Sequence, residues 1–208
     1  MTAYAYERDP AAIYARSFAI VRAEARLAHL PPGAHPLAIR VAHACGMVDV
    51  TDDLVASEGA VAAGQRALAE GASILVDARM VEHGIIAARL PEGCEVACAL
   101  NDPRVPTLAA EFGTTRSAAQ VELWRDRLAG AVVAIGNAPT ALFRLLEVVR
   151  DGAPRPALVI GMPVGFVGAA ESKEALIASD LAHVAVRGRR GGSAMAAAAV
   201  NALAGGLE

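Results

Sequence analysis

The chain has 208 residues, of which 55% are hydrophobic and 20% charged, and its net charge at pH 7 is −3. This composition supplies a large core and excludes intrinsic disorder, and at this length we expect one domain spanning residues 1–208. The slight negative charge and the aromatic content of 4% argue against a nucleic-acid-binding protein, which needs a basic surface or aromatic stacking platforms.

The first third of the chain is predicted to be helical. Asp9 and Pro10 have the residue types of an N-cap and a first helical position. The Pro-Pro-Gly sequence at 31–33 ends this helical section, because proline and glycine interrupt helices. A second helix is predicted to begin near Pro36, and a third covers about 58–70.

Beyond residue 70, short apolar runs alternate with helical segments. An uninterrupted apolar run is typical of a strand that is buried on both faces. Alternation of such strands with helices predicts βαβ units, and therefore an open, doubly wound α/β sheet of five parallel strands. The predicted strands are 74–76, 95–100, 132–135, 157–160 and 184–186, and the predicted helices are 78–84, 107–128, 139–150, 171–180 and 193–203.

Three glycine-bearing loops, 136–140, 161–168 and 187–193, directly follow predicted strands. The carboxyl ends of parallel strands meet at one edge of the sheet, where doubly wound folds bind their ligands. Glycine lets backbone amides approach a ligand, helix N-termini attract anions, and the third loop adds three arginines. Each loop alone is equally compatible with a simple tight turn, but together they indicate a small anionic ligand.

His43 is the strongest candidate for proton transfer. It lies in a predicted helix among apolar neighbours, and Arg40 is on the same helical face. Histidine titrates near neutral pH, although in such a place it is more often a hydrogen-bonded core residue. Ser17 and Arg116 taken alone are more simply explained as solvated or helix-capping residues. The residues themselves therefore indicate an enzyme that binds an anion, without naming the reaction.

The chain contains three cysteines, Cys45, Cys94 and Cys98, with no C-x-x-C pair. Their odd number and spacing argue against a disulfide framework or a zinc site, and no two histidines are spaced as metal ligands, so we expect no bound metal. The N-terminal residues do not resemble a signal peptide. The longest uncharged stretch, 191–207, is too short and too weakly apolar for a membrane span. We expect a cytoplasmic protein without a membrane or nucleic-acid partner.

Five segments, in order and in spacing, resemble the precorrin-8X methylmutase family, also called precorrin isomerases, of cobalamin (vitamin B12) biosynthesis. The most distinctive is Gly136-Asn-Ala-Pro-Thr-Ala-Leu-Phe143. The resemblance spans nearly the whole chain, and two of the segments are eight or more residues long, which makes it specific. The other four segments are Arg40–His43, Pro163–Glu174, Gly188–Ala194 and Val200–Leu203.

The resemblance implies a single flavodoxin-like domain, a homodimer and an isomerisation that uses no cofactor. A methyl group moves from C-11 to C-12 of precorrin-8X and gives hydrogenobyrinic acid. By the same resemblance His43 is the general acid, and Ser17 and Arg40 match positions that contact the substrate. The substrate carries a rim of carboxylates, which cationic side chains and backbone amides are expected to hold. Further candidates for these contacts are Arg116, Lys173, Arg187, Arg189 and Arg190.

Three alternatives stay open at this point. A sister branch of the family acts on the cobalt-loaded substrate. A non-catalytic carrier would hold a corrinoid intermediate until its hand-over to a neighbouring pathway enzyme. A nucleotide- or phosphate-binding regulator also fits the fold class, but the loops lack the lysine of a phosphate-binding loop and the acidic residue that binds a ribose.

Overall fold

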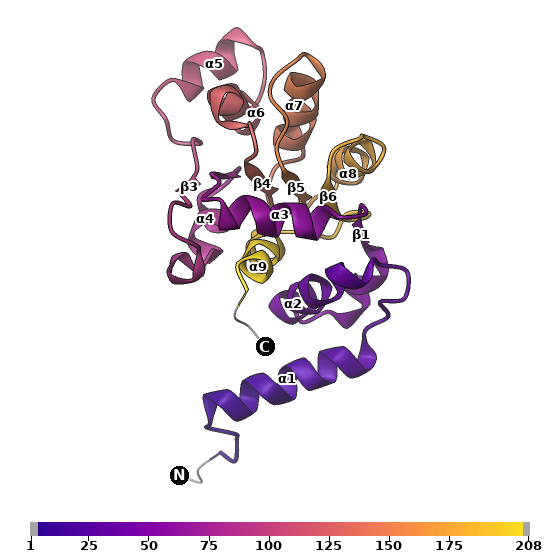
Figure 1. Cartoon of the computed structure of the whole chain (residues 1–208). Helices are drawn as coiled ribbons and strands as arrows, with labels where there is room; N and C mark the ends of the chain where they lie inside the picture. The colour runs from indigo at the N-terminus through magenta and orange to yellow at the C-terminus, as the bar shows by residue number, and fades with distance from the viewer. Residues whose placement is uncertain (1–3, 206–208) are drawn as a thin grey trace.

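The computed structural model describes residues 4–205, so the ends of the predicted domain, 1–3 and 206–208, lie outside the described residues. A central sheet separates two helical layers (Figure 1). Helices α5 to α8 cover one face, and α3, α4 and α9 lie on the other. On this second side α2 packs against α9, and α1 lies outermost against α2.

The sheet has six strands in the order β1-β6-β5-β4-β2-β3. Five of them are parallel. Four coincide closely with the predicted runs, because each is an apolar segment buried between helical layers, whereas the strand predicted at 95–100 is only two half-buried residues at the sheet edge. The five parallel strands are β2 (Ile74–Val76), β3 (Val96–Ala97), β4 (Val132–Ile135), β5 (Leu158–Gly161) and β6 (His183–Val186).

The prediction of a five-stranded, all-parallel sheet is wrong at one edge. Strand β1 (Leu54–Ala56) pairs antiparallel with β6, with Leu54 opposite Val186. At three residues β1 is shorter than an ordinary strand, and it is too short to show an alternation of apolar and polar residues. It pairs because the preceding 3₁₀-helix, Val48–Asp53, contacts β6 and places the chain beside the free edge of that strand.

The five parallel strands lie in the order β3-β2-β4-β5-β6. Numbered along the chain, this is the 2-1-3-4-5 order of a doubly wound, flavodoxin-like sheet. The direction of winding reverses between β2 and β4, so the carboxyl ends of these two strands form the topological switch point.

The predicted helix 107–128 is instead three shorter elements. Helix α5 (Val105–Glu111) ends before Gly113, whose positive φ of 58° places it in the left-handed conformation that favours glycine. Thr115 then starts α6 (Arg116–Ala119) as an N-cap, since its side chain accepts a hydrogen bond from the Ala118 amide. A 3₁₀-helix, Gln120–Arg127, follows.

Most of the other helices match their predicted positions closely, but the first one ends at Glu24 and not at the Pro-Pro-Gly of 31–33, and α8 begins two residues and ends three residues before its predicted bounds. Asp9 caps the first helix as expected, its side chain accepting a hydrogen bond from the Ala11 amide. Their bounds are α1 (Pro10–Glu24), α2 (His35–Cys45), α3 (Ala60–Ala69), α4 (Arg79–Gly84), α7 (Pro139–Arg150), α8 (Ala169–Ile177) and α9 (Ser193–Leu203).

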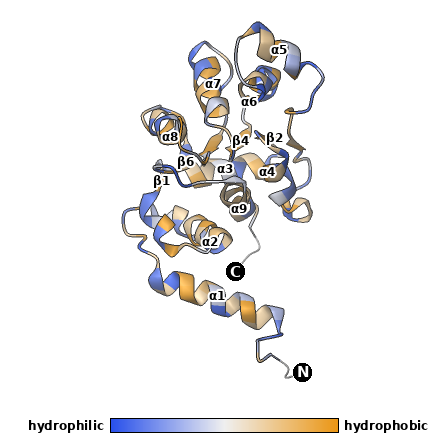
Figure 2. Ribbon diagram, turned by 180° about the vertical axis from the view of Figure 1, so that it is seen from behind, coloured by the Kyte–Doolittle hydropathy of each residue, from blue (hydrophilic) through white to orange (hydrophobic). Residues whose placement is uncertain are grey.

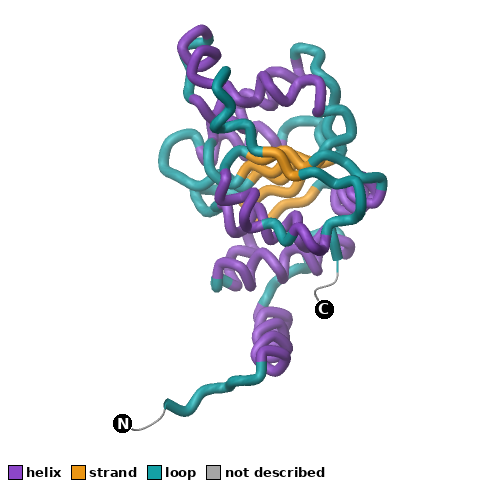
Figure 3. The backbone as a smooth tube through the Cα atoms, turned by 90° about the vertical axis from the view of Figure 1, so that its left-hand side faces the viewer, coloured by secondary structure: helices purple, strands orange, loops and turns teal. Residues whose placement is uncertain are grey.

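Two apolar clusters form the core, one on each face of the sheet. The larger lies between the sheet and α2, α3, α4 and α9, and the smaller lies under α7, α8 and the 3₁₀-helix 120–127. Helix α1 projects from the rest of the molecule (Figure 3) and carries apolar residues although it is outermost (Figure 2). Among the described helices, none has the length and apolar character needed to cross a membrane.

Candidate functional site

His43 lies in the last turn of α2, where residues of α1 hold its ring. The Ser17 Oγ is 3.0 Å from His43 Nδ1. The Phe18 ring stacks on the imidazole with centroids 4.5 Å apart and planes at 25°, and the Tyr14 ring lies 5.4 Å away. Because one nitrogen and one ring face have partners on α1, and the tilted Tyr14 ring lies beside them, the imidazole has a defined orientation and its Nε2 is left for a ligand.

Arg40 lies one turn before His43 and is only 9% exposed. Its Nη1 donates to the Tyr14 hydroxyl at 3.1 Å, and its buried Nε has no hydrogen-bond partner among the described residues. Burial, and secondarily the positive charge of Arg40, lower the pKa of His43. In the free protein His43 is therefore mainly neutral at pH 7, and Arg40 holds an unused donor beside it.

His43 and Arg40 line a hollow of about 200 Å³ between three helices. Helix α9 supplies most of its floor, and small side chains keep it open. Its rim adjoins the loop after β6, since α9 begins directly at the end of that loop. The remaining lining residues are Ala44, Gly84, Ala194, Ala197, Ala198 and Asn201.

Asn201 fixes the wall opposite His43. Its side-chain oxygen accepts a hydrogen bond from the Ile86 amide at 2.8 Å, and its Nδ2 donates to the Gly84 carbonyl at 2.9 Å. The end of α4 is so close to α9 that a Cβ on Gly84 would lie 2.7 Å from the Ala197 Cβ. No role was predicted for Asn201 from the sequence. Its position in the Val200–Leu203 segment, which resembles the family, was the one signal that could have pointed to it.

The other predicted cationic contacts lie outside this hollow. Arg116 is exposed on α6, across the sheet, and donates to the Leu100 carbonyl and Asn101 Oδ1 at 3.0 and 3.1 Å. Arg187 is exposed and pairs with Glu174 at 2.5 Å. Lys173 is fully buried, and its Nζ donates to the Arg190 carbonyl at 2.6 Å.

The arginines of the loop after β6 also have partners within the protein. Arg190 pairs with Asp49 at 2.6 Å and with Asp53. The Arg189 guanidinium lies 5.3 Å from the centre of the Phe166 ring. These contacts hold the loop to its neighbours, so the three-loop anion cradle expected from the sequence is not assembled as one site in the single chain.

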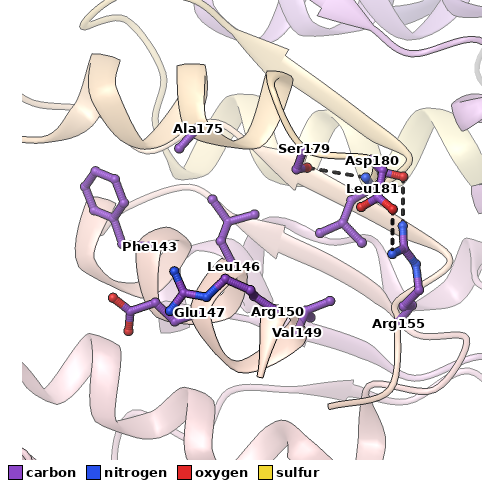
Figure 4. Close-up of a pocket in the computed structure, with 10 residues that line it drawn as sticks. All are labelled: Phe143, Leu146, Glu147, Val149, Arg150, Arg155, Ala175, Ser179, Asp180 and Leu181. Carbon is purple, nitrogen blue, oxygen red and sulfur yellow. Dashed lines mark hydrogen bonds and ion pairs between the residues drawn. The ribbon is translucent and has the colours of Figure 1, made fainter. Parts of the chain in front are cut away.

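A larger cavity, of about 570 Å³, lies between α7 and α8 (Figure 4). It is bordered by Arg155 and Leu181, which precede β5 and β6, and so lies at the amino ends of these strands. Arg155 and Asp180 pair with each other across its end. The predicted site residues do not line it, and ligands of doubly wound sheets bind at the opposite edge. The His43 hollow is therefore the better candidate.

Comparison with known proteins decides the family. The family model described as precorrin-8X methylmutase matches residues 12–205. The chain belongs to the precorrin-8X methylmutase family. A Pseudomonas aeruginosa protein of this name is 63% identical over 201 residues, 96% of this chain and 97% of that protein. A Sinorhizobium sp relative with the same name is 60% identical, covering 98% of each chain.

A solved structure of the precorrin-8X methylmutase from Thermus thermophilus has the same fold. It aligns with a TM-score of 0.85 at 42% identity and covers 93% of this chain and 94% of that chain. Within the methylmutase fold, the segments Arg40–His43 and Val200–Leu203 line the hollow, and Gly188–Ala194 reaches its rim. The most distinctive methylmutase segment, Gly136–Phe143, does not line the hollow.

Cysteine, histidine and carboxylate side chains do not gather into a metal site in the described part of the methylmutase chain. Burial raises the pKa of Cys45, Cys94 and Cys98. The cysteines are therefore mainly thiols at neutral pH, poorly suited to nucleophilic catalysis.

Proposed function

We propose that the protein isomerises precorrin-8X to hydrogenobyrinic acid by moving a methyl group from C-11 to C-12. The observation that carries this proposal is the Ser17–His43–Arg40 cluster, in a chain that belongs to the methylmutase family. One histidine is oriented by a hydroxyl and two rings, and a buried arginine with a free donor lies beside it. The cluster therefore places a possible proton donor, His43, beside a possible carboxylate contact, Arg40, in a hollow lined mainly by small residues.

The proposed reaction depends on a proton donor more than on a nucleophilic side chain. The bond between the methyl group and C-11 breaks while the bond to C-12 forms, so the methyl stays on the substrate. We infer that substrate carboxylates contact Arg40 and offset its charge, which raises the pKa of His43 and lets it take up a proton. His43 then protonates the ring-C region and recovers the proton when the product forms. A positioned general acid contributes about 10²- to 10⁴-fold in rate.

We assign Arg40 as the main carboxylate contact in the hollow, because its Nε proton is buried beside His43 without a protein partner among residues 4–205. Arg116 and Arg187 stay proposed contacts for outlying carboxylates, since both guanidinium groups are exposed. We infer that Lys173 acts indirectly, because its Nζ is occupied with the Arg190 carbonyl and holds the loop at the rim.

We propose that the protein works as a homodimer on the metal-free substrate. A hollow of about 200 Å³ is small beside the several hundred cubic ångströms of an ordinary ligand site, and a macrocycle needs further walls. A second copy covering α1 and α2 would provide them. The choice of precorrin-8X over its cobalt form is supported by the two relatives at 63% and 60% identity, which are named for the metal-free substrate.

Turnover of precorrin-8X, followed by its visible spectrum, tests the proposal. We expect catalytic conversion by the wild type, and a loss of about 10²- to 10⁴-fold in kcat for a folded His43→Ala variant with nearly unchanged product affinity. His29→Ala is the matched control, because His29 lies outside the hollow and contacts the Leu54 carbonyl. Wild-type turnover in folded His43→Ala would contradict the role of His43.

The same assay separates an enzyme from a carrier of corrinoid intermediates. A carrier changes the spectrum once per protein molecule and stops, whereas an isomerase converts an excess of substrate. We propose that the enzyme releases its product slowly, which suits direct hand-over to the next pathway enzyme, and a burst followed by a slower steady state would reveal it. Running the assay with cobalt-precorrin-8 compares kcat/KM for the two substrate forms.

A further inference from the structure

A buried carboxylate lies at the switch point of the sheet. Asp77 follows β2 directly and is fully buried. Its Oδ1 accepts a hydrogen bond from the Gly136 amide at 2.9 Å, and its Oδ2 accepts from the Asn137 and Ala138 amides at 3.0 and 2.7 Å. Within residues 4–205, no cationic side chain forms an ion pair with it. Three consecutive backbone amides are therefore its charge partners.

These three amides belong to the loop between β4 and α7, which opens the most distinctive methylmutase segment. The loop stands at the β2–β4 switch and at the N-terminus of α7, a place that ordinarily attracts a ligand anion. In this protein the carboxylate of Asp77 fills that place. The amides of residues 136 to 138 are therefore already engaged, so a substrate contact from this loop has to come from its other groups.

The anchored loop packs against the walls of the His43 hollow. A Cβ on Gly136 would lie 2.8 Å from the Ser193 Cα and the Ala196 Cβ, and 3.0 Å from the Val81 side chain. Ser193 and Ala196 are in the first turns of α9, and Val81 is in α4. These are the two helices that face His43 across the hollow, so a shift of the loop moves that wall.

The backbone of Asp77 is fixed as well as its side chain. Gln120 is fully buried, and its Nε2 donates to the Asp77 carbonyl at 2.8 Å. The Gln120 Oε1 has no hydrogen-bond partner in the described part of the chain. A buried amide with one unsatisfied end costs stability. Its Nε2 offsets part of this cost with the short contact to Asp77 and a longer one of 3.4 Å to the Ser117 carbonyl.

We propose that Asp77 is a positioning residue for the isomerisation. Its carboxylate holds the β4–α7 loop, and through this loop the α4–α9 wall, in the arrangement that receives the substrate. The inference rests on the proposed function of the His43 hollow. It gives a role to three amides that Asp77 occupies in place of a ligand. It predicts an effect on binding more than on the chemical step, because the loop packs on the α4–α9 wall and not on His43.

Asp77→Asn tests the proposal, since it keeps the size of the side chain but turns an NH₂ donor toward the amide donors. We expect KM and the dissociation constant of hydrogenobyrinic acid to rise about 10- to 100-fold, while kcat at saturation changes less than about 3-fold. Ser172→Ala is the matched control. Ser172 is a buried hydroxyl that bonds the Ala169 carbonyl on α8, across the sheet, and its loss should lower the melting temperature without changing KM.

A second variant covers the case in which Asp77→Asn does not fold. Gln120→Met removes the donor to the Asp77 carbonyl, and it also removes the unpartnered oxygen, so it should fold. We expect KM to rise about 3- to 10-fold. Wild-type KM and product affinity in folded Asp77→Asn or Gln120→Met overturn the proposal, and so does an equal rise of KM in Ser172→Ala.

Amide NMR of the free protein separates this inference from the proposed function. In both Asp77→Asn and Gln120→Met we expect shifts of the resonances of residues 136–138 and of 193–201, without any substrate present. If the wild type fails to convert precorrin-8X while these shifts appear, the proposed function fails and the anchoring stands. If the α9 resonances do not move, Asp77 does not position the hollow, whatever the turnover.

Discussion

The half-buried imidazole of His43 illustrates how neighbours set the protonation of one residue. Burial and Arg40 both disfavour the imidazolium, so the pKa lies below its ordinary value of 6.5. The hydroxyl of Ser17 and the ring of Phe18 fix its direction without adding charge. In the proposed mechanism this neutral histidine becomes an acid when a carboxylate-bearing ligand offsets the charge of Arg40.

Replacing Arg40 by glutamine should raise the pKa of His43 toward 6.5. The sign follows because removing a nearby positive charge makes protonation of the imidazole easier. Titration of the His43 ring proton by NMR, assigned with His43→Ala, measures this shift. Arg187→Gln is the control, since Arg187 pairs with Glu174 outside the hollow. An unchanged pKa in Arg40→Gln would show that Arg40 does not act on His43.

Lys173 is the only lysine in the sequence, and it is fully buried. Burial lowers its pKa to about 8, whereas an unfolded lysine titrates near 10.4. Between these values the unfolded chain holds a proton that the folded chain has released. The contribution of this group to the unfolding free energy therefore increases as the pH rises from about 8 to about 10.4.

Lys173→Met should remove this dependence on pH. We expect the difference in unfolding free energy, wild type minus variant, to increase between pH 7.5 and pH 10 in denaturant titrations. Other titrating groups cancel in the difference. A constant difference would contradict the lowered pKa, and the single lysine allows a direct check by isotope-labelled lysine NMR.

At the scale of elements, the loops after β5 and β6 behave as one unit. The Gly192 amide donates to the Met162 carbonyl at 2.8 Å, and the Gly165 amide donates to the Arg189 carbonyl at 3.2 Å. Between them Gly191 passes so close that a Cβ would lie 2.3 Å from the Met162 oxygen. The rim of the hollow therefore depends on a glycine at this crossing.

Gly191→Ala should push the two loops apart, because the atoms it meets are backbone oxygens that cannot rotate away. We expect a loss of about 1–3 kcal/mol in the unfolding free energy together with weaker product binding, measured by denaturant titration and by calorimetry. Gly33→Ala is the control, since a Cβ there has no described atom within 4 Å. Equal stability of the two variants would refute the close crossing.

At the scale of the whole molecule, α1 is the outermost helix and packs mainly on α2. Phe18 and Val21 are its buried residues, while Ile13, Tyr14 and Ile20 are 48%, 38% and 46% exposed. Exposed apolar side chains beside a site mark an interaction surface. Helix α1 also carries Ser17, so the proposed dimer would cover the helix that orients His43.

Sedimentation at micromolar concentration should show a mass about twice the 21.3 kDa of the chain. Ile20→Glu should shift it toward the monomer and weaken product binding at the same time. Phe112→Glu, on an exposed side chain of the opposite layer, should leave the dimer intact. A monomeric wild type, or a dimer unaffected by Ile20→Glu, would disprove this role of α1.

Local sequence determined the elements whose signals are local. The buried parallel strands were predictable because apolar runs such as Val132–Ile135 have no polar face to expose, and α1 because Asp9 and Pro10 start it. The predicted helix 107–128 was wrong because one glycine, Gly113, takes a left-handed conformation that composition does not reveal. Strand β1 was missed because its pairing depends on a free edge 130 residues further along the chain.

The site was predictable in its residue types and not in its assembly. Resemblance to a family pointed to His43, Ser17 and Arg40, and the tertiary structure brings a serine and a histidine 26 residues apart to 3.0 Å. It also separates Arg116, Lys173 and Arg187 from them. The proposed role of Asp77 could not be predicted from the sequence, because its carboxylate accepts hydrogen bonds from backbone amides about 60 residues away. Every residue except proline carries such an amide, and only the folding of β4 beside β2 decides which of them meet the charge.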